Sequence, residues 1–84
     1  MNGSLPDRVR EILAVELQVE PGLVVPKARL RADLGMDSIA ALNVLFAAQE
    51  TFGLEEIDPT ELADVLTVAD VEALVDRHVR RAGA

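Results

Sequence analysis

The sequence predicts an all-α domain with three main helices and a short fourth helical element. Apolar residues recur at the three- and four-residue spacing of helices in three segments, and no segment alternates apolar and polar residues well enough for a sheet. The chain has 84 residues, of which 50% are hydrophobic. That length and composition can close one modest core, so we expect a single domain over residues 1–84.

The first helix is predicted over residues 6–19. Ser4 followed by Asp7, with Pro6 in the first turn, is typical of a helix start, because each residue suits the unpaired N–H groups there. The apolar residues that follow at helical spacing are Val9, Ile12, Leu13 and Leu17. Residues 20–22 contain proline and glycine, which disfavour continuation, so the helix should stop there.

The segment 21–36 is predicted to be a long loop between the first and second helices. Its apolar residues keep no sustained period, and Pro26 and Gly35 interrupt it. Loops of this length in compact domains are uncommon and are often functional. We expect its leucines to pack on the core and its end to deliver the chain to Ser38.

The second helix is predicted over residues 38–52, with Asp37 or Ser38 as its cap and Gly53 as a left-handed stop. At about 100° per residue, its apolar residues form two stripes about 120° apart. The first stripe contains Ala41, Leu45, Ala48 and Phe52, and the second contains Ile39, Leu42 and Phe46. One stripe suffices for a core. The second stripe therefore either packs against the long loop or forms an exposed apolar patch for partners.

Two further helices are predicted over residues 59–64 and 68–81. In residues 58–61, Asp58 is a helix cap, Pro59 occupies the first helical position and Glu61 is the acid of a capping box, which predicts a short helix. Thr67 with Asp70 forms a second capping box. The apolar face of the last helix consists of Val68, Val71, Leu74, Val75 and Val79.

Composition excludes several classes of function. The chain has no cysteine and only one histidine, His78, so we expect no metal site. Its net charge of -7 opposes binding to nucleic acids and favours encounters with basic protein surfaces. The longest mostly apolar stretch, 39–48, is shorter than the ~20 residues that span a bilayer, and the N-terminal pattern is not that of a signal peptide. We expect a cytoplasmic monomer that binds neither membranes nor nucleic acids.

Residues 33–39, Asp-Leu-Gly-Met-Asp-Ser-Ile, resemble the attachment motif of acyl carrier proteins, with Asp37-Ser38-Ile39 in place of the family's Asp-Ser-Leu. The resemblance covers nearly the whole chain, including Phe52 near the end of the second helix. It implies a phosphopantetheine-binding carrier domain. A phosphopantetheinyl transferase would move 4'-phosphopantetheine from coenzyme A to the Ser38 hydroxyl. The thiol of that arm would carry acyl groups as thioesters, so the lack of cysteine is no obstacle.

The expected position of Ser38 suits this role. A phosphodiester there would lie beside the positive end of a helix dipole and near free N–H groups. A serine that ends a glycine-containing loop can also enter the active site of a transferase. Taken alone, Asp37 and Ser38 could simply be helix caps, since these residue types are preferred at such positions in any protein. The match around them favours attachment.

Residues near Ser38 are predicted to contact partner enzymes. In the family that the chain resembles, the residue after the serine and those one and two turns later commonly meet partners. This favours partner contact for Ile39 and a role shared between core and interface for Leu42 and Phe46. The full predicted contact set is Asp37, Ile39, Leu42, Phe46, Glu50, Ile57 and Asp58. Many acyl carriers have several acids along the second helix, but this one has only Glu50, so its partners should rely on apolar contact.

The expected function is a non-catalytic carrier for a polyketide or other specialised pathway, such as antibiotic biosynthesis. Its partners would be a phosphopantetheinyl transferase and an acyltransferase, a ketosynthase or an acyl- or aminoacyl-loading ligase. A peptidyl or aminoacyl carrier is the nearest alternative. A helical interaction module would use the second stripe and would not need Ser38. A serine hydrolase would need a general base beside Ser38, and the only histidine, His78, lies far away in the last predicted helix. The sequence also lacks the Gly-x-Ser-x-Gly turn that holds the serine in many hydrolases.

Overall fold

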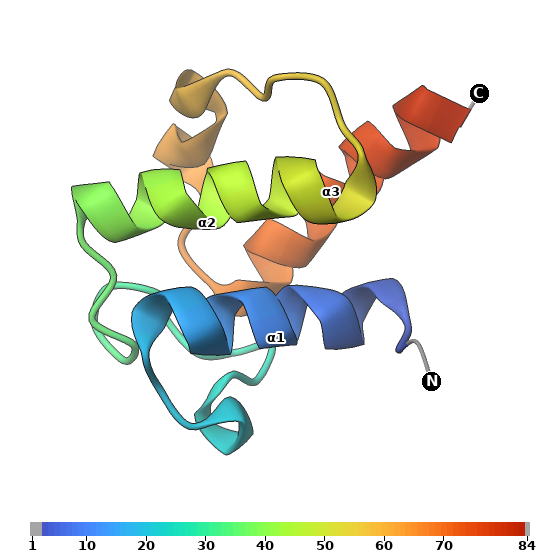
Figure 1. Cartoon of the computed structure of the whole chain (residues 1–84). Coiled ribbons are helices and arrows are strands. Elements are labelled where there is room, and N and C mark those ends of the chain that lie inside the picture. The colour runs from blue at the N-terminus through green and yellow to red at the C-terminus, as the bar shows by residue number, and fades with distance from the viewer. Residues whose placement is uncertain (1–2, 84) are drawn as a thin grey trace.

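A computed structural model describes residues 3–83 and confirms the all-α class (Figure 1). Its elements in chain order are α1 (Leu5–Leu17), η1 (Pro21–Leu23), α2 (Ser38–Phe52), η2 (Pro59–Asp64) and α3 (Val68–Gly83), where η marks a 3-10 helix. Figure 1 shows α1 and α2 side by side and antiparallel, with α3 crossing behind them. Within residues 3–83 there is no β-strand, and one isolated bridge pairs Arg29 with Thr67.

The helix starts are capped by the side chains that the sequence indicates. The Ser4 hydroxyl accepts a hydrogen bond of 3.3 Å from the backbone N–H of Asp7 at the start of α1. At the start of α3, the Thr67 hydroxyl accepts from the N–H of Asp70 at 3.3 Å, and the Asp70 carboxylate accepts from the N–H of Thr67 at 3.0 Å. This reciprocal pair is the predicted capping box, and it satisfies donors that a helix cannot pair internally.

Two helix ends differ from the prediction. α1 ends at Leu17, short of the predicted end at residue 19, because Gln18 takes a left-handed conformation with φ 55°. The N–H of Val19 then bonds back to the Ala14 carbonyl at 3.1 Å, which closes the helix end. α3 continues to Gly83, past the predicted end at residue 81, because basic side chains in its last turn suit the negative end of the helix dipole.

The core lies between the three α-helices and the long loop and is built from aliphatic side chains and Met36. No polar or charged residue is buried among residues 3–83. The largest fully buried side chains are Leu13, Leu30, Ile57, Val9, Val24 and Val68. Fully burying a valine, leucine or isoleucine contributes about 1.5–3 kcal/mol each. Contacts contributed by the loop are therefore part of the fold's stability.

Backbone hydrogen bonds hold the long loop against the start of α3. The N–H of Leu30 donates to the Leu66 carbonyl at 2.9 Å, and the N–H of Val68 donates to the Ala28 carbonyl at 3.0 Å. Leu30 and Leu34 are buried as predicted, while Leu23 is exposed because it lies in η1, a turn that the sequence did not indicate. These bonds tie residues 28–30 of the loop to the start of α3.

The predicted short helix at residues 59–64 is the 3-10 helix η2. The Asp58 carboxylate caps it by accepting a hydrogen bond of 2.9 Å from the N–H of Thr60. A Glu61 carboxylate oxygen lies 3.0 Å from Nε2 of His78 on α3. The histidine of this chain therefore joins η2 to the last helix.

Candidate functional site

The start of α2 presents Ser38 to solvent. Asp37 caps the helix: its carboxylate accepts a hydrogen bond of 2.7 Å from the N–H of Ala40, and its carbonyl accepts one of 2.9 Å from Ala41. Ser38 is the first residue of α2, and its side chain is exposed. The first N–H groups of a helix have no intrahelical partner, so free donors lie beside the hydroxyl. The structure thus places Asp37 as the cap and Ser38 in the open first turn.

A backbone hydrogen bond and a glycine shape the turn before Ser38. The N–H of Met36 donates to the Leu30 carbonyl at 2.9 Å, which brings the chain back across the turn. Gly35 has φ 72°, a conformation that favours glycine, and a Cβ at this position would meet no atom within 4 Å. Glycine at this position therefore lets the chain make the turn that leads to Ser38.

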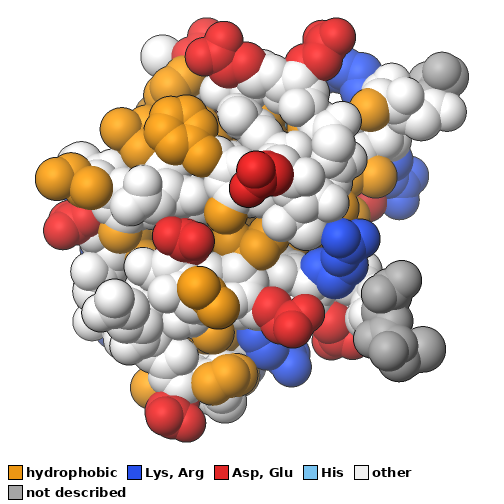
Figure 2. Space-filling view, viewed as in Figure 1, with side chains coloured by type: hydrophobic (Ala, Val, Ile, Leu, Met, Phe, Trp, Pro, Cys, Tyr) orange, Lys and Arg blue, Asp and Glu red, His pale blue; other side chains and the backbone are white. Residues whose placement is uncertain are grey.

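The two apolar stripes of α2 face different surroundings. Ala41, Leu45 and Ala48 of the first stripe are buried. The side chains of the second stripe are exposed, with 72% of Ile39, 38% of Leu42 and 53% of Phe46 accessible to solvent. Figure 2 shows hydrophobic side chains gathered over the first part of α2 and over η2, with acidic side chains around them. The second stripe is thus an unpaired apolar surface that begins beside Ser38.

Most of this sequence is similar to known proteins. Residues 7–75 match the family described as the phosphopantetheine attachment site. Acyl carrier proteins of Thermosynechococcus vestitus and Zymomonas mobilis are 36% and 35% identical to the chain. The first match covers 87% of this chain and 89% of the relative, and the second covers 86% and 91%. The chain belongs to the phosphopantetheine-attachment family.

The carrier also resembles a solved carrier structure. A crystal structure of a free-standing peptidyl carrier protein from a secondary metabolic pathway of Acinetobacter baumannii aligns with a TM-score of 0.68 and 33% identity. The alignment covers 86% of this chain and 89% of that one. The all-α carrier fold is therefore shared between the two proteins, and 4'-phosphopantetheine is the prosthetic group that the family implies.

One residue of the predicted contact set lies inside the carrier. Ile57 is only 1% exposed, so the prediction that it contacts partners is wrong for this conformation. It follows a polar turn in the sequence, and only packing shows that its side chain reaches the core. Glu50 and Asp58 are exposed, as are Asp37 and the second stripe. Their contact with partners stays a prediction.

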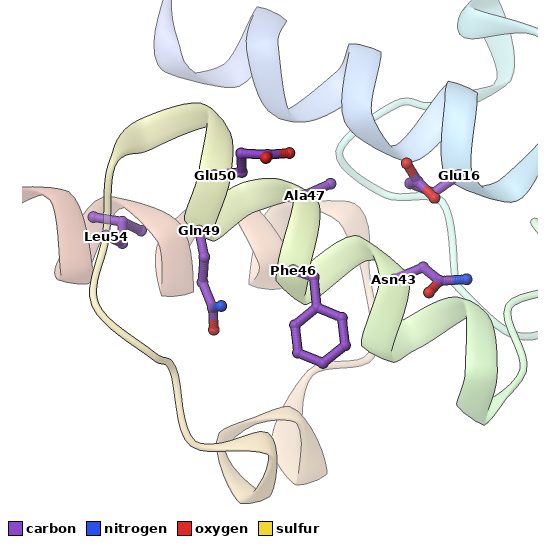
Figure 3. A pocket seen from close by; sticks show the side chains of 7 residues that line it. All are labelled: Glu16, Asn43, Phe46, Ala47, Gln49, Glu50 and Leu54. Atoms are coloured by element: carbon purple, nitrogen blue, oxygen red, sulfur yellow. The ribbon is translucent and has the colours of Figure 1, made fainter.

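A depression of about 520 Å³ lies along α2, facing solvent (Figure 3). Its lining comprises Glu16, Asn43, Phe46, Ala47, Gln49, Glu50 and Leu54. In Figure 3 the Glu16 and Glu50 side chains extend toward the space above Ala47, while the Phe46 ring points toward η2. The depression is a feature of the carrier's outer surface, and its side chains form no enclosed site for a small molecule.

The interior of the carrier has little free space. A small apolar void of about 20 Å³ lies between α2, η2 and α3, and its walls include Leu45, Leu62, Val65 and Leu74. Such a void has room for about one water molecule. In this conformation the core is closed, and an acyl group could enter it only if the surrounding elements moved apart.

Leu66 is an exposed apolar residue that the sequence analysis missed. Its position just before the Thr67 cap is typical of a residue that packs back onto its own helix, but its side chain is 67% exposed. The Leu66 carbonyl accepts the loop's Leu30 N–H, so Leu66 borders the segment that leads to Ser38. The exposure of the Leu66 side chain could not be predicted from the sequence pattern, because it depends on how the chain packs.

No group of metal-binding side chains occurs among residues 3–83. In the same part of the chain, every helix is too short or too polar to span a lipid bilayer.

Proposed function

We propose that Ser38 is the attachment point for phosphopantetheine and that the protein carries acyl groups between biosynthetic enzymes. The observation that carries this proposal is the exposed Ser38 hydroxyl at the first turn of α2, in a chain that belongs to the phosphopantetheine-attachment family. When bound, the arm would supply a thiol that holds an acyl group as a thioester, which is activated toward acyl transfer and α-carbon chemistry.

The residues around Ser38 fit such an arm. Attachment joins the Ser38 oxygen to the phosphorus of the phosphopantetheine group of coenzyme A, and the remaining nucleotide bisphosphate leaves as the hydroxyl proton is lost. The product is an anionic phosphodiester beside the N-terminus of α2, where the helix dipole and free N–H groups favour negative charge. Asp37 keeps the helix start in place through its bond to Ala40. Ser38 itself is exposed, so its hydroxyl is accessible.

Partner enzymes would meet the surface that begins at Ser38. Ile39, Leu42 and Phe46 supply apolar contact, and Asp37, Glu50 and Asp58 supply negative charge around it. An apolar centre with a charged border is the usual anatomy of a protein–protein interface. Carrier proteins interact with phosphopantetheinyl transferases and with acyl-processing enzymes. For this chain we propose an acyltransferase, a ketosynthase or a loading ligase, and we propose that it acts as a monomer without catalytic activity of its own.

A specialised pathway, such as polyketide biosynthesis, is the setting that we propose. The solved structure from a secondary metabolic pathway and the paucity of acids on α2 support it. That same structure is a peptidyl carrier, which makes aminoacyl cargo the second candidate. The cytoplasmic location remains the sequence-based prediction, because coenzyme A and its transferase would have to reach Ser38.

Intact mass of the purified protein tests the attachment site. The protein is incubated with coenzyme A and a broad-specificity phosphopantetheinyl transferase, beside a Ser38→Ala control whose helicity is checked by circular dichroism. We expect the wild type to gain one phosphopantetheine and the control to gain none. A folded, initially unmodified wild type that gains nothing would contradict the proposal and would favour the helical interaction module. Loading of the modified protein with acyl and aminoacyl donors then separates the two kinds of cargo.

A further inference from the structure

Arg29 and Asp33 form a clasp across the turn that leads to Ser38. The Asp33 carboxylate accepts three hydrogen bonds from Arg29: one from the backbone N–H at 2.8 Å, one from Nε at 3.3 Å and one from Nη2 at 3.2 Å. The paired guanidinium lowers the pKa of the Asp33 carboxyl below its usual value. Because both side chains are exposed, this clasp does not serve to satisfy a buried charge.

The clasp begins just before one anchored residue of the chain and ends before a second. On one side, Leu30 is buried, and its N–H is bonded to the Leu66 carbonyl just before α3. On the other side, Met36 is buried, and its N–H is bonded back to the Leu30 carbonyl. Between these anchors only Leu34 is buried. Backbone N–H groups of Asp33 and Leu34 also donate to the Arg29 carbonyl, at 2.9 and 3.2 Å, and that of Gly35 donates to the Arg31 carbonyl at 3.1 Å. The Arg29–Asp33 pair adds a side-chain link to these backbone bonds across the exposed part of the turn.

We propose that Arg29 and Asp33 are positioning residues for phosphopantetheine attachment. Their clasp holds the turn 29–36 in the conformation that presents Ser38 to the transferase. An exposed ion pair adds little to global stability, but a short exposed turn opens locally at small free-energy cost, so the pair can decide which conformation the turn populates. Binding weakens in proportion to the fraction of molecules in the competent conformation. This inference rests on the proposed function of Ser38.

The chain contains a matched control for the clasp. Arg80 and Asp76 on α3 are the same residue types at the same four-residue separation, with Nε and Oδ2 2.7 Å apart. The exposed fractions of the arginine and aspartate side chains are 80% and 43% in this pair, against 67% and 41% in the clasp. Breaking either pair removes the same charges and one exposed ion pair, and Asp33→Ala also removes the acceptor of the Arg29 backbone N–H. Only the clasp lies in the turn before Ser38.

The test is the steady-state kinetics of phosphopantetheine attachment with the full chain as substrate. We expect Asp33→Ala to raise KM for the carrier by about three- to tenfold with kcat unchanged, because fewer molecules present the serine correctly. Arg29→Ala should have a smaller effect, since the backbone N–H at position 29 still donates to Asp33. The double variant should match Asp33→Ala alone, because the two side chains act as one unit. Asp76→Ala and Arg80→Ala should match the wild type.

Two results would overturn the inference. One is an Asp33→Ala protein with the same KM as Asp76→Ala. The other is a double variant whose effect is the sum of the single effects, which would mean that each side chain contacts the transferase separately. Amide hydrogen exchange at residues 35–38 provides an independent readout: it should be faster in Asp33→Ala and unchanged in Asp76→Ala. If the wild type gains no phosphopantetheine, the attachment proposal fails, while the exchange rates still test the clasp.

Discussion

The side-chain oxygen of Gln49 accepts a hydrogen bond of 2.7 Å from the backbone N–H of Ile57. This bond joins α2 to the irregular segment that leads into η2, at a residue whose side chain is buried. It explains how a residue in an otherwise polar turn becomes buried.

Removing this bond should weaken the fold. We expect Gln49→Ala to lower the free energy of unfolding by about 1–3 kcal/mol, because the partly buried N–H of Ile57 would lose its acceptor. Gln49→Glu keeps a side-chain oxygen at the same distance along the chain and should lose less. Urea unfolding followed by circular dichroism measures both. Equal stability of Gln49→Ala and the wild type would show that solvent satisfies this N–H.

Substitution by alanine should affect stability very differently at Ile57 and at Ile39. Ile57→Ala should lower the free energy of unfolding by about 2–5 kcal/mol, as expected for a fully buried side chain. Ile39→Ala should change it by less than about 0.5 kcal/mol, because Ile39 is exposed.

Partner enzymes should be affected more by Ile39→Ala than by Ile57→Ala. Ile39→Ala should reduce the rate at which a transferase or an acyl-processing enzyme uses the carrier, since it removes apolar area from the predicted interface. Ile57→Ala should be used normally at temperatures where it is folded. If the enzymes tolerate Ile39→Ala, the stripe beside Ser38 is not their contact surface.

Stability should fall in acid through two capping aspartates. Backbone N–H groups of Leu66 and Thr67 lower the pKa of the Asp70 carboxyl, and the N–H of Thr60 lowers that of Asp58. A carboxyl with a lower pKa in the folded state stabilises the fold above its unfolded pKa of about 3.9, and this contribution is lost as the pH falls through the folded value.

Thermal unfolding at a series of pH values measures this effect. We expect the wild type to lose stability from about pH 5 downward. Asp70→Asn should be less stable than the wild type at neutral pH and should show a shallower loss in acid, since it has one fewer titrating cap. Parallel profiles for the two proteins would exclude Asp70 as a source of the acid sensitivity.

Two glycines with open surroundings offer a matched test of backbone strain. A Cβ at Gly53 or at Gly22 would meet no atom within 4 Å, but only Gly53 has a positive φ, of 64°. Gly53→Ala should therefore cost about 1 kcal/mol of unfolding free energy, from the left-handed conformation alone. Gly22→Ala should be neutral or slightly stabilising, because alanine restricts the unfolded chain. A neutral Gly53→Ala would mean that α2 can end in another conformation.

Local chemistry in the sequence was sufficient to predict where the three α-helices begin. Ser4, Asp37 and the Thr67–Asp70 pair cap the helices that they predict, and Gly53 ends α2 in the left-handed conformation. The periodicity of α2 predicted two apolar stripes. These features depend on residues within one or two turns of each other, so they can be read without knowledge of the fold.

Tertiary packing decided the rest. Contacts between segments far apart in the chain decide which stripe of α2 is buried, and they place Ile57 in the core while Leu66 is exposed. The exact path of an irregular loop decides how Arg29 and Asp33 meet across the turn. Proline, glycine and polar residues indicate that the segment 21–36 is a loop, but they do not specify its path. That path follows from backbone bonds to α3 and from burial of leucines, and it sets where Ser38 is presented.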